Sequence, residues 1–327
     1  MFSFNTPNFI FRFSLGETDY QLGATDYERF AAEYAFFGRS VWQQTLNLTD
    51  EEKTELIRLL QENYRPENRV YRYNFFYDNC ATRPRDKIEE SIAGKVIYPA
   101  EPQDGSLTFR DIVHQYCKGH PWARFGIDLC IGSEADQPIT QRQMMFAPFY
   151  LMDAFDGAQI KGDSIQRPLI TANELVVDAT PEPDESDWMP TPLQCSLLLF
   201  ILTAAATIYG IRRRTGLWGI DLFLFGIAGI VGCVLAFLAL FSQHPAVSSN
   251  FLLLVFHPGQ LLFLPYIVYC VRKGKKCWYL TLNLVVLTLF IVLFPVIPQR
   301  FDFAVVPLAL VLLIRSASNL IVTSKKK

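Results

Sequence analysis

Long apolar runs dominate the C-terminal part of the chain, and they restrict what it can fold into. Five runs are long enough to cross a hydrocarbon core of about 30 Å, which takes roughly 20 helical residues. They are Leu193–Ile211, Leu217–Phe241, Phe251–Val271, Cys277–Val296 and Phe303–Val322. Only two acidic residues, Asp221 and Asp302, occur after Leu193. We therefore expect residues 193–327 to form an all-α membrane domain of five transmembrane helices.

The basic residues between these runs alternate, and the alternation predicts the orientation in the membrane. Basic clusters follow the first, third and fifth runs, whereas the loops after the second and fourth hold only Arg300. The clusters are Arg212, Arg213 and Arg214; Arg272, Lys273, Lys275 and Lys276; and Lys325, Lys326 and Lys327. Because basic residues favour the cytoplasmic side, we expect a cytoplasmic C-terminus. The N-terminal part is then expected outside the cytoplasm.

Residues 1–163 have the mixed composition of a soluble domain. A capping-box pattern at Thr49 to Glu52 predicts a helix start. Helices are expected at Tyr27–Arg39, Asp50–Glu62, Phe109–Tyr116 and Met144–Phe155, a loop at Gly119–Trp122, and a short strand or helix at Phe125–Ile131. Residues 164–192 are expected to form an acidic, proline-rich linker. The net charge of −2 argues against nucleic acid as a partner.

The seven cysteines show no CxxC or Cys/His spacing of a zinc site, so we expect neither a metal nor a cofactor. In an exported domain, Cys117 and Cys130 could form a disulfide, or both could stay as thiols. The polar residues Asp221, Asn283 and Arg315 in the apolar runs could be functional or could pair within the helix bundle.

The segment around Cys80 contains the candidate nucleophile. An aromatic run, which predicts a buried strand or the end of one, stops at Asp78 and Asn79, two residue types that favour helix caps. Cys80 follows, and Pro84 suits the first turn of a helix. A thiol at such a junction lies near unpaired backbone N–H groups and the positive end of a helix dipole, which favours the attacking thiolate. The alternative is that Cys80 is a small buried apolar residue.

A thiol nucleophile needs a base, usually a histidine. The soluble part offers His114, expected on the surface of a helix, and His120, expected in a loop before a proline. His244 lies in the loop after the second apolar run, on the same side of the membrane as the soluble domain. His244 is therefore the candidate base.

The string from Tyr73 to Asp86 resembles the signature of the Bacteroidota-type lipoprotein N-acyltransferase (Lnb) family. Four further segments resemble other parts of that family, as does the order of a soluble domain and then several membrane spans. These segments are Phe4–Phe9, Pro121-Trp122 with Phe125-Gly126, Met145–Pro148 and His244-Pro245. The resemblance covers most of the chain.

The resemblance implies an α+β papain-like, permuted thiol-enzyme fold for the periplasmic residues 1–163, tethered to the bacterial inner membrane. It also implies acyl transfer from a phospholipid to the α-amine of a lipoprotein diacylglyceryl-cysteine, without a cofactor. Cys80 would form the acyl thioester. The supporting residues, which would shape the site or bind a headgroup, are Asn79, Arg83, Asp86, Tyr73 and Asn74.

The chain departs from the family at its start. The family places a Gly-His-Ser segment, whose histidine would be the base, upstream of the region that matches Phe4–Phe9. The first residues also lack the pattern of a signal peptide. We therefore expect an N-terminally truncated, incomplete member that is inactive for lack of this histidine, unless His244 replaces it. The alternatives are a membrane-tethered cysteine peptidase or amidase acting on cell-wall peptides, and a non-catalytic lipid-binding scaffold.

Overall fold

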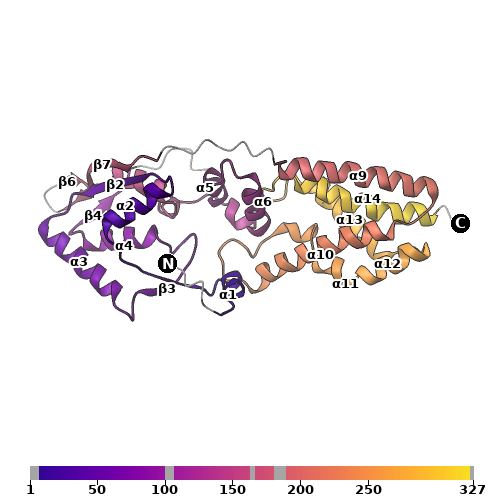
Figure 1. Cartoon of the computed structure of the whole chain (residues 1–327), viewed down its shortest axis with the longest axis horizontal. Helices are drawn as coiled ribbons and strands as arrows, with labels where there is room; N and C mark the ends of the chain where they lie inside the picture. Colours follow the sequence, from indigo (N-terminus) through magenta and orange to yellow (C-terminus); the bar gives the residue numbers. More distant parts are fainter. Residues whose placement is uncertain (1–6, 100–106, 163–165, 180–188, 325–327) are drawn as a thin grey trace. The chain divides into compact units, whose positions relative to one another are not determined.

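The computed structural model describes residues 7–99, 107–162, 166–179 and 189–324, and the chain divides into two compact units (Figure 1). The first unit consists of residues 1–112, 138–188 and 243–245. The second consists of residues 113–137, 189–242 and 246–327. Residues 113–137 thus belong with the apolar helices, although the sequence placed them in the soluble domain.

The first unit contains small antiparallel sheets. Their paired strands are β1 (Asp19–Gln21) with β3 (Val70–Arg72), β2 (Val41–Leu46) with β7 (Ile170–Val177), and β4 (Lys95–Ile97) with β5 (Gln159–Lys161) and β6 (Gln166–Pro168). In the first pair, Tyr20 lies opposite Tyr71. Strands β6 and β7 fall in the range 164–192 that was expected to be a linker. The residues Leu169 and Ile170 are buried, which ties this range to the domain core.

The helices of the first unit follow the sequence pattern closely. They are α1 (Phe9–Leu15), α2 (Tyr27–Phe36), α3 (Asp50–Tyr64), α4 (Thr82–Ser91), α7 (Gln141–Met144) and α8 (Pro148–Asp156), with the start of α5 (Phe109–Tyr116). The predicted capping box is present: Thr49 Oγ1 accepts from the Glu52 N–H, and Glu52 Oε2 accepts from the Thr49 N–H. One expected helix is interrupted, because Ala147 before Pro148 takes an extended conformation.

Two groups of buried side chains stabilise the first unit. One joins Ile92, Phe155 and Ile160 to the strands at Leu169 and Ile170. The other is aromatic and consists of Phe76, Phe109 and Phe146. The rings of Phe76 and Phe109 stack with their centroids 4.1 Å apart, and Phe146 meets Phe76 edge-on at 5.2 Å. Phe76 lies four residues before Cys80, and the Phe146 carbonyl accepts from the Asn79 side chain, so this aromatic group is joined to the Cys80 segment.

The second unit contains the apolar helices. Among the described residues, three helices are long and apolar enough to cross a membrane: α9 (Pro192–Arg213), α10 (Trp218–Phe241) and α14 (Val305–Ser324). A fourth candidate is a broken span, in which η2 (Phe251–Leu254) and α11 (Pro258–Leu262) meet α12 (Leu264–Lys273) at a bend of 74°. The helix α13 (Trp278–Leu293) is apolar but only 16 residues long. Prolines near the starts of α11 and α12 account for the bend.

Polar groups of the apolar runs pair inside the bundle. Arg315 Nε and Nη2 contact the two carboxylate oxygens of Asp221 at 2.7 and 3.0 Å, and Nη1 donates to Thr207. Asn283 Nδ2 donates to Ser316 Oγ at 3.1 Å. Of the alternatives that the sequence left open for these residues, the structure supports pairing.

The segment 113–137 joins the second unit through amide side chains. It contains the end of α5, α6 (Pro121–Cys130) and η1 (Ser133–Asp136). Asn250 Nδ2 donates to the Leu129 carbonyl at 2.7 Å, and Gln299 Nε2 donates to the Ile131 carbonyl at 3.2 Å. The expected loop at Gly119–Trp122 is wrong, because Pro121 occupies the first position of α6.

Candidate active site around Cys80

Cys80 is exposed and lies two residues before α4 begins. The aromatic run before it is not a continuous strand: β3 ends at Arg72, and residues 74–78 form a closed loop. Asn74 and Asp78 exchange both backbone hydrogen bonds at 2.9 and 3.0 Å, and Asn74 Oδ1 accepts from the Tyr77 N–H. The run therefore contains the end of a strand, at Arg72, but not a continuous buried strand, because β3 is largely exposed and the chain then folds back in a loop before the thiol. The exposed thiol also argues against a buried apolar role.

Asn79 holds the residue before the thiol in place. Its side chain is buried and makes four hydrogen bonds. Oδ1 accepts from the N–H groups of Ala81 and Thr82 at 2.8 and 3.0 Å, so it caps the start of α4. Nδ2 donates to the carbonyls of Phe75 and Phe146 at 2.8 and 2.9 Å. Asn79 thus links the segment around Cys80 to the distant residue Phe146. The N-cap residue of α4 is Ala81, and Asn79 binds the N–H groups of Ala81 and Thr82 from two and three residues upstream.

Arg83 pairs with a neighbouring acid. Its Nε and Nη2 bind the two carboxylate oxygens of Asp78 at 2.6 and 2.8 Å. Its guanidinium carbon lies 3.4 Å from the centre of the Tyr71 ring. A bidentate pair of this kind has defined geometry as well as charge. Arg83 therefore holds the loop before Cys80 through Asp78. If a phosphate bound here, the guanidinium would have to pair with both Asp78 and the phosphate.

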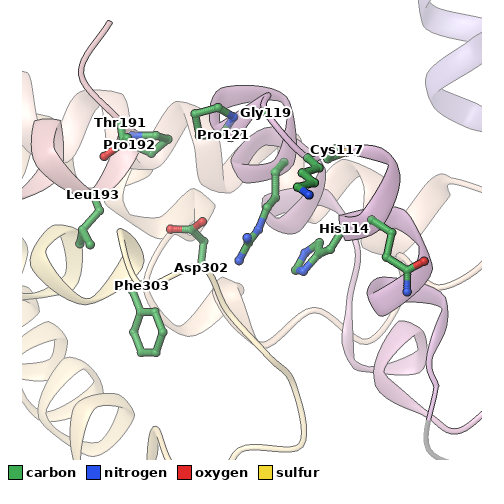
Figure 2. A pocket seen from close by; sticks show the side chains of 12 residues that line it. His114, Cys117, Gly119, Pro121, Thr191, Pro192, Leu193, Asp302 and Phe303 are labelled. Atoms are coloured by element: carbon green, nitrogen blue, oxygen red, sulfur yellow. The ribbon is translucent and has the colours of Figure 1, made fainter. Parts of the chain in front are cut away.

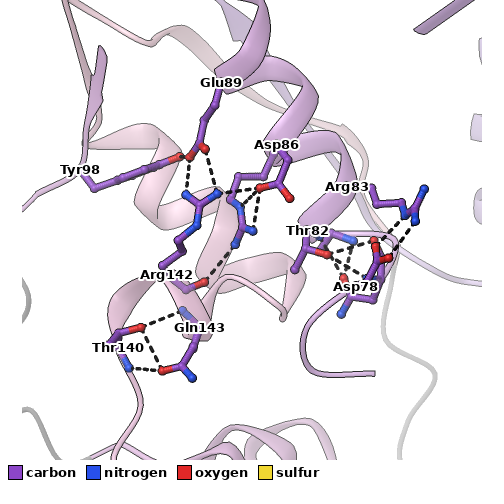
Figure 3. A network of polar contacts seen from close by, with 12 residues as sticks. Asp78, Thr82, Arg83, Asp86, Glu89, Tyr98, Thr140, Arg142 and Gln143 are labelled. Atoms are coloured by element: carbon purple, nitrogen blue, oxygen red, sulfur yellow. Dashed lines mark hydrogen bonds and ion pairs between the residues drawn. The ribbon is translucent and has the colours of Figure 1, made fainter. Parts of the chain in front are cut away.

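Asp86 belongs to a polar network on the other side of α4 (Figure 3). Its Oδ1 accepts from Arg85 Nε and Arg142 Nη2, both at 2.8 Å. Arg142 also binds the carboxylate of Glu89, which accepts in addition from the hydroxyl of Tyr98. Arg85 is buried and donates to the Arg142 carbonyl at 3.0 Å. The sequence did not identify Arg142, because no local pattern relates it to α4.

Three tyrosines surround the thiol: Tyr20, Tyr71 and Tyr73. Burial raises the pKa of Tyr73 to about 12, and the negative charge of a Cys80 thiolate adds to the effect. The pKa values of Tyr20 and Tyr71 are also raised, with burial the larger cause. All three phenols are therefore protonated at neutral pH. A neutral phenol beside a nucleophile can donate a hydrogen bond to an oxyanion that develops there.

His244 lies in the first unit, although it follows the apolar helix α10. Its Nε2 is 2.6 Å from the Phe13 carbonyl oxygen, and its ring packs against the Phe13 ring at 5.5 Å. Gly16, with φ of +74°, permits the close approach of its backbone to the backbone of His244, since a Cβ at Gly16 would lie 3.1 Å from the His244 backbone nitrogen. Within the described ranges, no histidine is hydrogen-bonded to the Cys80 thiol.

His114 has a different environment from the one expected. Its Nε2 lies 2.8 Å from Oδ1 of Asp128, whose side chain is 3% exposed. His114 is thus held by a buried acid, not solvated on a helix surface. The nearby Cys117 is a free thiol, as is Cys130. Burial, followed by the charge of Asp128, raises the pKa of Cys117, which disfavours its thiolate.

In the ranges that the structure describes, no group of three or more His, Cys, Asp or Glu side chains could hold a metal ion.

An exposed thiol at a helix start in one unit and apolar helices of membrane length in the other define a membrane-integrated protein with an extramembrane domain. Residues 2–114 match the family model described as the Lnb N-terminal periplasmic domain, and residues 184–327 match the Lnb transmembrane domain. The chain belongs to the Lnb family and is a multi-pass membrane protein with a periplasmic N-terminal domain. No curated protein and no solved structure matched the chain.

Proposed function

We propose that this protein is a lipoprotein N-acyltransferase of the bacterial inner membrane. It would transfer an acyl chain from a phospholipid to the α-amine of a lipoprotein diacylglyceryl-cysteine through a thioester on Cys80. The observation that carries the proposal is the exposed Cys80 thiol at the start of α4, held by the four hydrogen bonds of Asn79. Membership of the Lnb family supports the same reaction.

The reaction would proceed in two halves. In the first, the Cys80 thiolate attacks the ester carbonyl of the phospholipid, the ester C–O bond breaks, and the leaving alkoxide takes up a proton. The products are a lysophospholipid and an acyl thioester. In the second, the lipoprotein α-amine attacks the thioester, the C–S bond breaks, and the amine loses a proton to a base. Covalent catalysis divides one difficult transfer into two easier steps.

His244 is our candidate for the base. Its placement in the same unit as Cys80 supports this role, and the contact of its Nε2 with the Phe13 carbonyl would orient the ring. His114 is the weaker candidate, because its Nε2 is held by Asp128 and it belongs to the other unit. The phenol of Tyr73 would donate to the oxyanion of the tetrahedral intermediate.

The supporting residues divide by their contacts. Asn79 and Asn74 would set the position of the thiol, and Asp86 would hold α4 through its bond with Arg142 of α7. Arg83 would exchange part of its pairing with Asp78 for a substrate phosphate.

We propose that the chain crosses the membrane five times and that its C-terminus lies in the cytoplasm. We also propose that the periplasmic domain has a papain-like thiol-enzyme fold. The basic residues at the ends of α9 and α12 support the orientation. The thiol at a helix start supports the fold. Completing five passes requires α13 to cross the membrane together with the residues after it.

The test is to trap the acyl thioester. The purified full chain would be incubated with a phospholipid that carries an isotope-labelled acyl chain, and peptides would be analysed by mass spectrometry. The proposal predicts a labelled acyl group on the Cys80 peptide that hydroxylamine removes. Cys80→Ala should abolish it, His244→Ala should reduce it, and Cys130→Ala, which removes another free thiol, should leave it unchanged.

Release of labelled amines from cell-wall peptides without any acyl–Cys80 species would favour a peptidase or amidase instead. Normal lipid turnover in the Cys80→Ala variant would contradict the thioester mechanism.

A further inference from the structure

The second unit contains a cavity of about 500 Å³ (Figure 2). Four segments line it: the end of α5, the start of α6, the start of α9 and the turn before α14. All of its lining residues belong to the second unit.

One wall of this cavity is cationic. Lys118 and Arg124 line it, and both are exposed. His114 lies beside them, with its Nε2 held by the buried Asp128 at 2.8 Å. Arg124 Nε is 3.9 Å from the second carboxylate oxygen of Asp128, which orients the guanidinium without a close hydrogen bond. These side chains together present positive charge and N–H donors to the cavity.

One acid lines the same cavity, and its position limits its effect. Asp302 Oδ1 accepts from the Ala304 N–H at 2.8 Å, so the carboxylate caps the start of α14. A carboxylate at the N-terminus of a helix is partly neutralised by the helix dipole. Lys118 and Arg124 therefore face the cavity with two positive charges against the single, capped carboxylate of Asp302, while the carboxylate of Asp128 is buried and contacts Arg124 and His114.

The other wall is apolar and lies at the start of two membrane helices. Leu193 near the start of α9 is 38% exposed, and Phe303 before α14 is 70% exposed. Trp122 is also exposed, and its indole N–H donates to the Pro190 carbonyl at 3.0 Å. Tryptophan is enriched at membrane–water interfaces. Because α9 follows the periplasmic domain, these residues lie at the periplasmic surface of the membrane.

We propose that this cavity binds the phosphate-bearing headgroup of a membrane glycerophospholipid. Lys118 and Arg124 would bind the phosphate, while Leu193 and Phe303 would contact the first carbons of the acyl chains. Arginine and lysine are the residues that proteins use for phosphate, and the adjoining apolar wall selects a lipid over a free anion. The inference rests on the proposed function only in assigning this lipid as the acyl donor.

The test measures lipid binding directly. The purified full chain in detergent would be titrated with phosphatidylglycerol, and bound lipid would be counted by native mass spectrometry. Lys118→Gln with Arg124→Gln should weaken binding by roughly a hundredfold or more, since the loss of each charged hydrogen bond to the phosphate weakens binding by about tenfold or more. Arg124→Lys, which keeps the charge, should bind more tightly than Arg124→Gln.

A matched control removes two basic side chains elsewhere. Lys53→Gln with Arg58→Gln, on exposed α3, changes the net charge equally and should leave lipid binding unchanged. Lys118→Gln alone guards against misfolding, since no salt bridge of Lys118 occurs among the described residues. Equal affinity in the wild type and the double variant at Lys118 and Arg124 would overturn the proposal.

Two further arms separate the possible outcomes. Inorganic phosphate should fail to displace the lipid at equal concentration; displacement would reveal a site for free anions and overturn the lipid assignment. Cys80→Ala should keep lipid binding while losing the thioester. If binding depends on Lys118 and Arg124 but no thioester forms, the proposed function fails and the lipid site stands. If the thioester forms but lipid binding does not depend on Lys118 and Arg124, only the proposed lipid site is refuted.

Discussion

The hydrogen bonds of Asn79 predict a large effect for a nearly isosteric change, Asn79→Asp. The carboxylate would keep an oxygen to accept from the N–H groups of Ala81 and Thr82. It would lose both N–H donors, so the carbonyls of Phe75 and Phe146 would face a negative oxygen. Asn79 is only 3% exposed and its bond to the Phe146 carbonyl is buried, so water cannot replace that donor without a rearrangement, whereas the bond to the Phe75 carbonyl is partly buried.

The magnitude follows from these contacts. Loss of the donor to the buried Phe146 carbonyl costs about 1–3 kcal/mol, and loss of the partly buried bond to the Phe75 carbonyl costs about 0.5–1.5 kcal/mol. The carboxylate at the start of α4 returns roughly 0.3–1 kcal/mol by its interaction with the helix dipole. We therefore expect a loss of about 1–4 kcal/mol in the free energy of unfolding. At about 2–4 °C per kcal/mol for a domain of this size, that loss lowers the melting temperature by roughly 2–16 °C.

The assay is thermal unfolding of the full chain in detergent, combined with thioester formation on Cys80. Asn68→Asp is the matched control, because Asn68 is exposed and bonds only to Glu62 through its side chain. The control should change the melting temperature by a few degrees at most. An Asn79→Asp protein as stable as the control would refute the role we assign to Asn79.

Three further predictions concern other contacts. Burial alone would raise the pKa of Glu89, but hydrogen bonds, above all from Arg142, outweigh it and lower this pKa. The ionised Glu89 therefore stabilises the fold at neutral pH, and this contribution is lost as the pH falls through the lowered pKa. In Glu89→Gln, the free energy of unfolding should depend less on pH in the acid range. Asp221→Asn leaves the buried charge of Arg315 unpaired and should cost about 3–5 kcal/mol in thermal unfolding in detergent. Gly232→Ala places a Cβ 2.4 Å from a backbone nitrogen and should lower the melting temperature through a cost of about 1–3 kcal/mol.

Each of these predictions has a control within the chain. Glu51→Gln, at an exposed position of α3, should leave the pH dependence of the free energy of unfolding in the acid range unchanged. Combining Asp221→Asn with Arg315→Gln should recover part of the stability that the single change removes. Gly219→Ala should be tolerated, because no atom lies within 4 Å of the added carbon. Equal effects of a substitution and its control would contradict the contact that motivates it.

Local patterns predicted the local structure well. The capping box at Thr49 and Glu52 is made by residues three apart, and the helix Phe109–Tyr116 has the bounds that its periodicity predicted. Apolar length alone identified α9, α10 and α14. These features depend on residues that are close in the sequence, so they can be predicted from the sequence. Pro258 and Pro265 are a local sequence signal for the bend before α12.

Long-range contacts could not be predicted in the same way. The segment 113–137 joins the membrane unit through Asn250 and Gln299, more than a hundred residues away. Strand β6 is only three residues long, and the eight-residue strand β7 directly precedes an acidic, proline-rich stretch, so composition assigned both to a linker. At the candidate site, Cys80 and Asn79 had local signals, whereas Arg142 enters the network from another helix.

The most direct test of the account is the acylation state of lipoproteins in cells. The natural gene would be expressed in cells without their own lipoprotein N-acylation, and N-terminal lipoprotein peptides would be analysed by mass spectrometry. Our account predicts a third acyl chain, joined by an amide, with the wild-type protein and with Cys130→Ala, but none with Cys80→Ala. Diacylated peptides alone, despite normal amounts of the protein in the membrane, would contradict it.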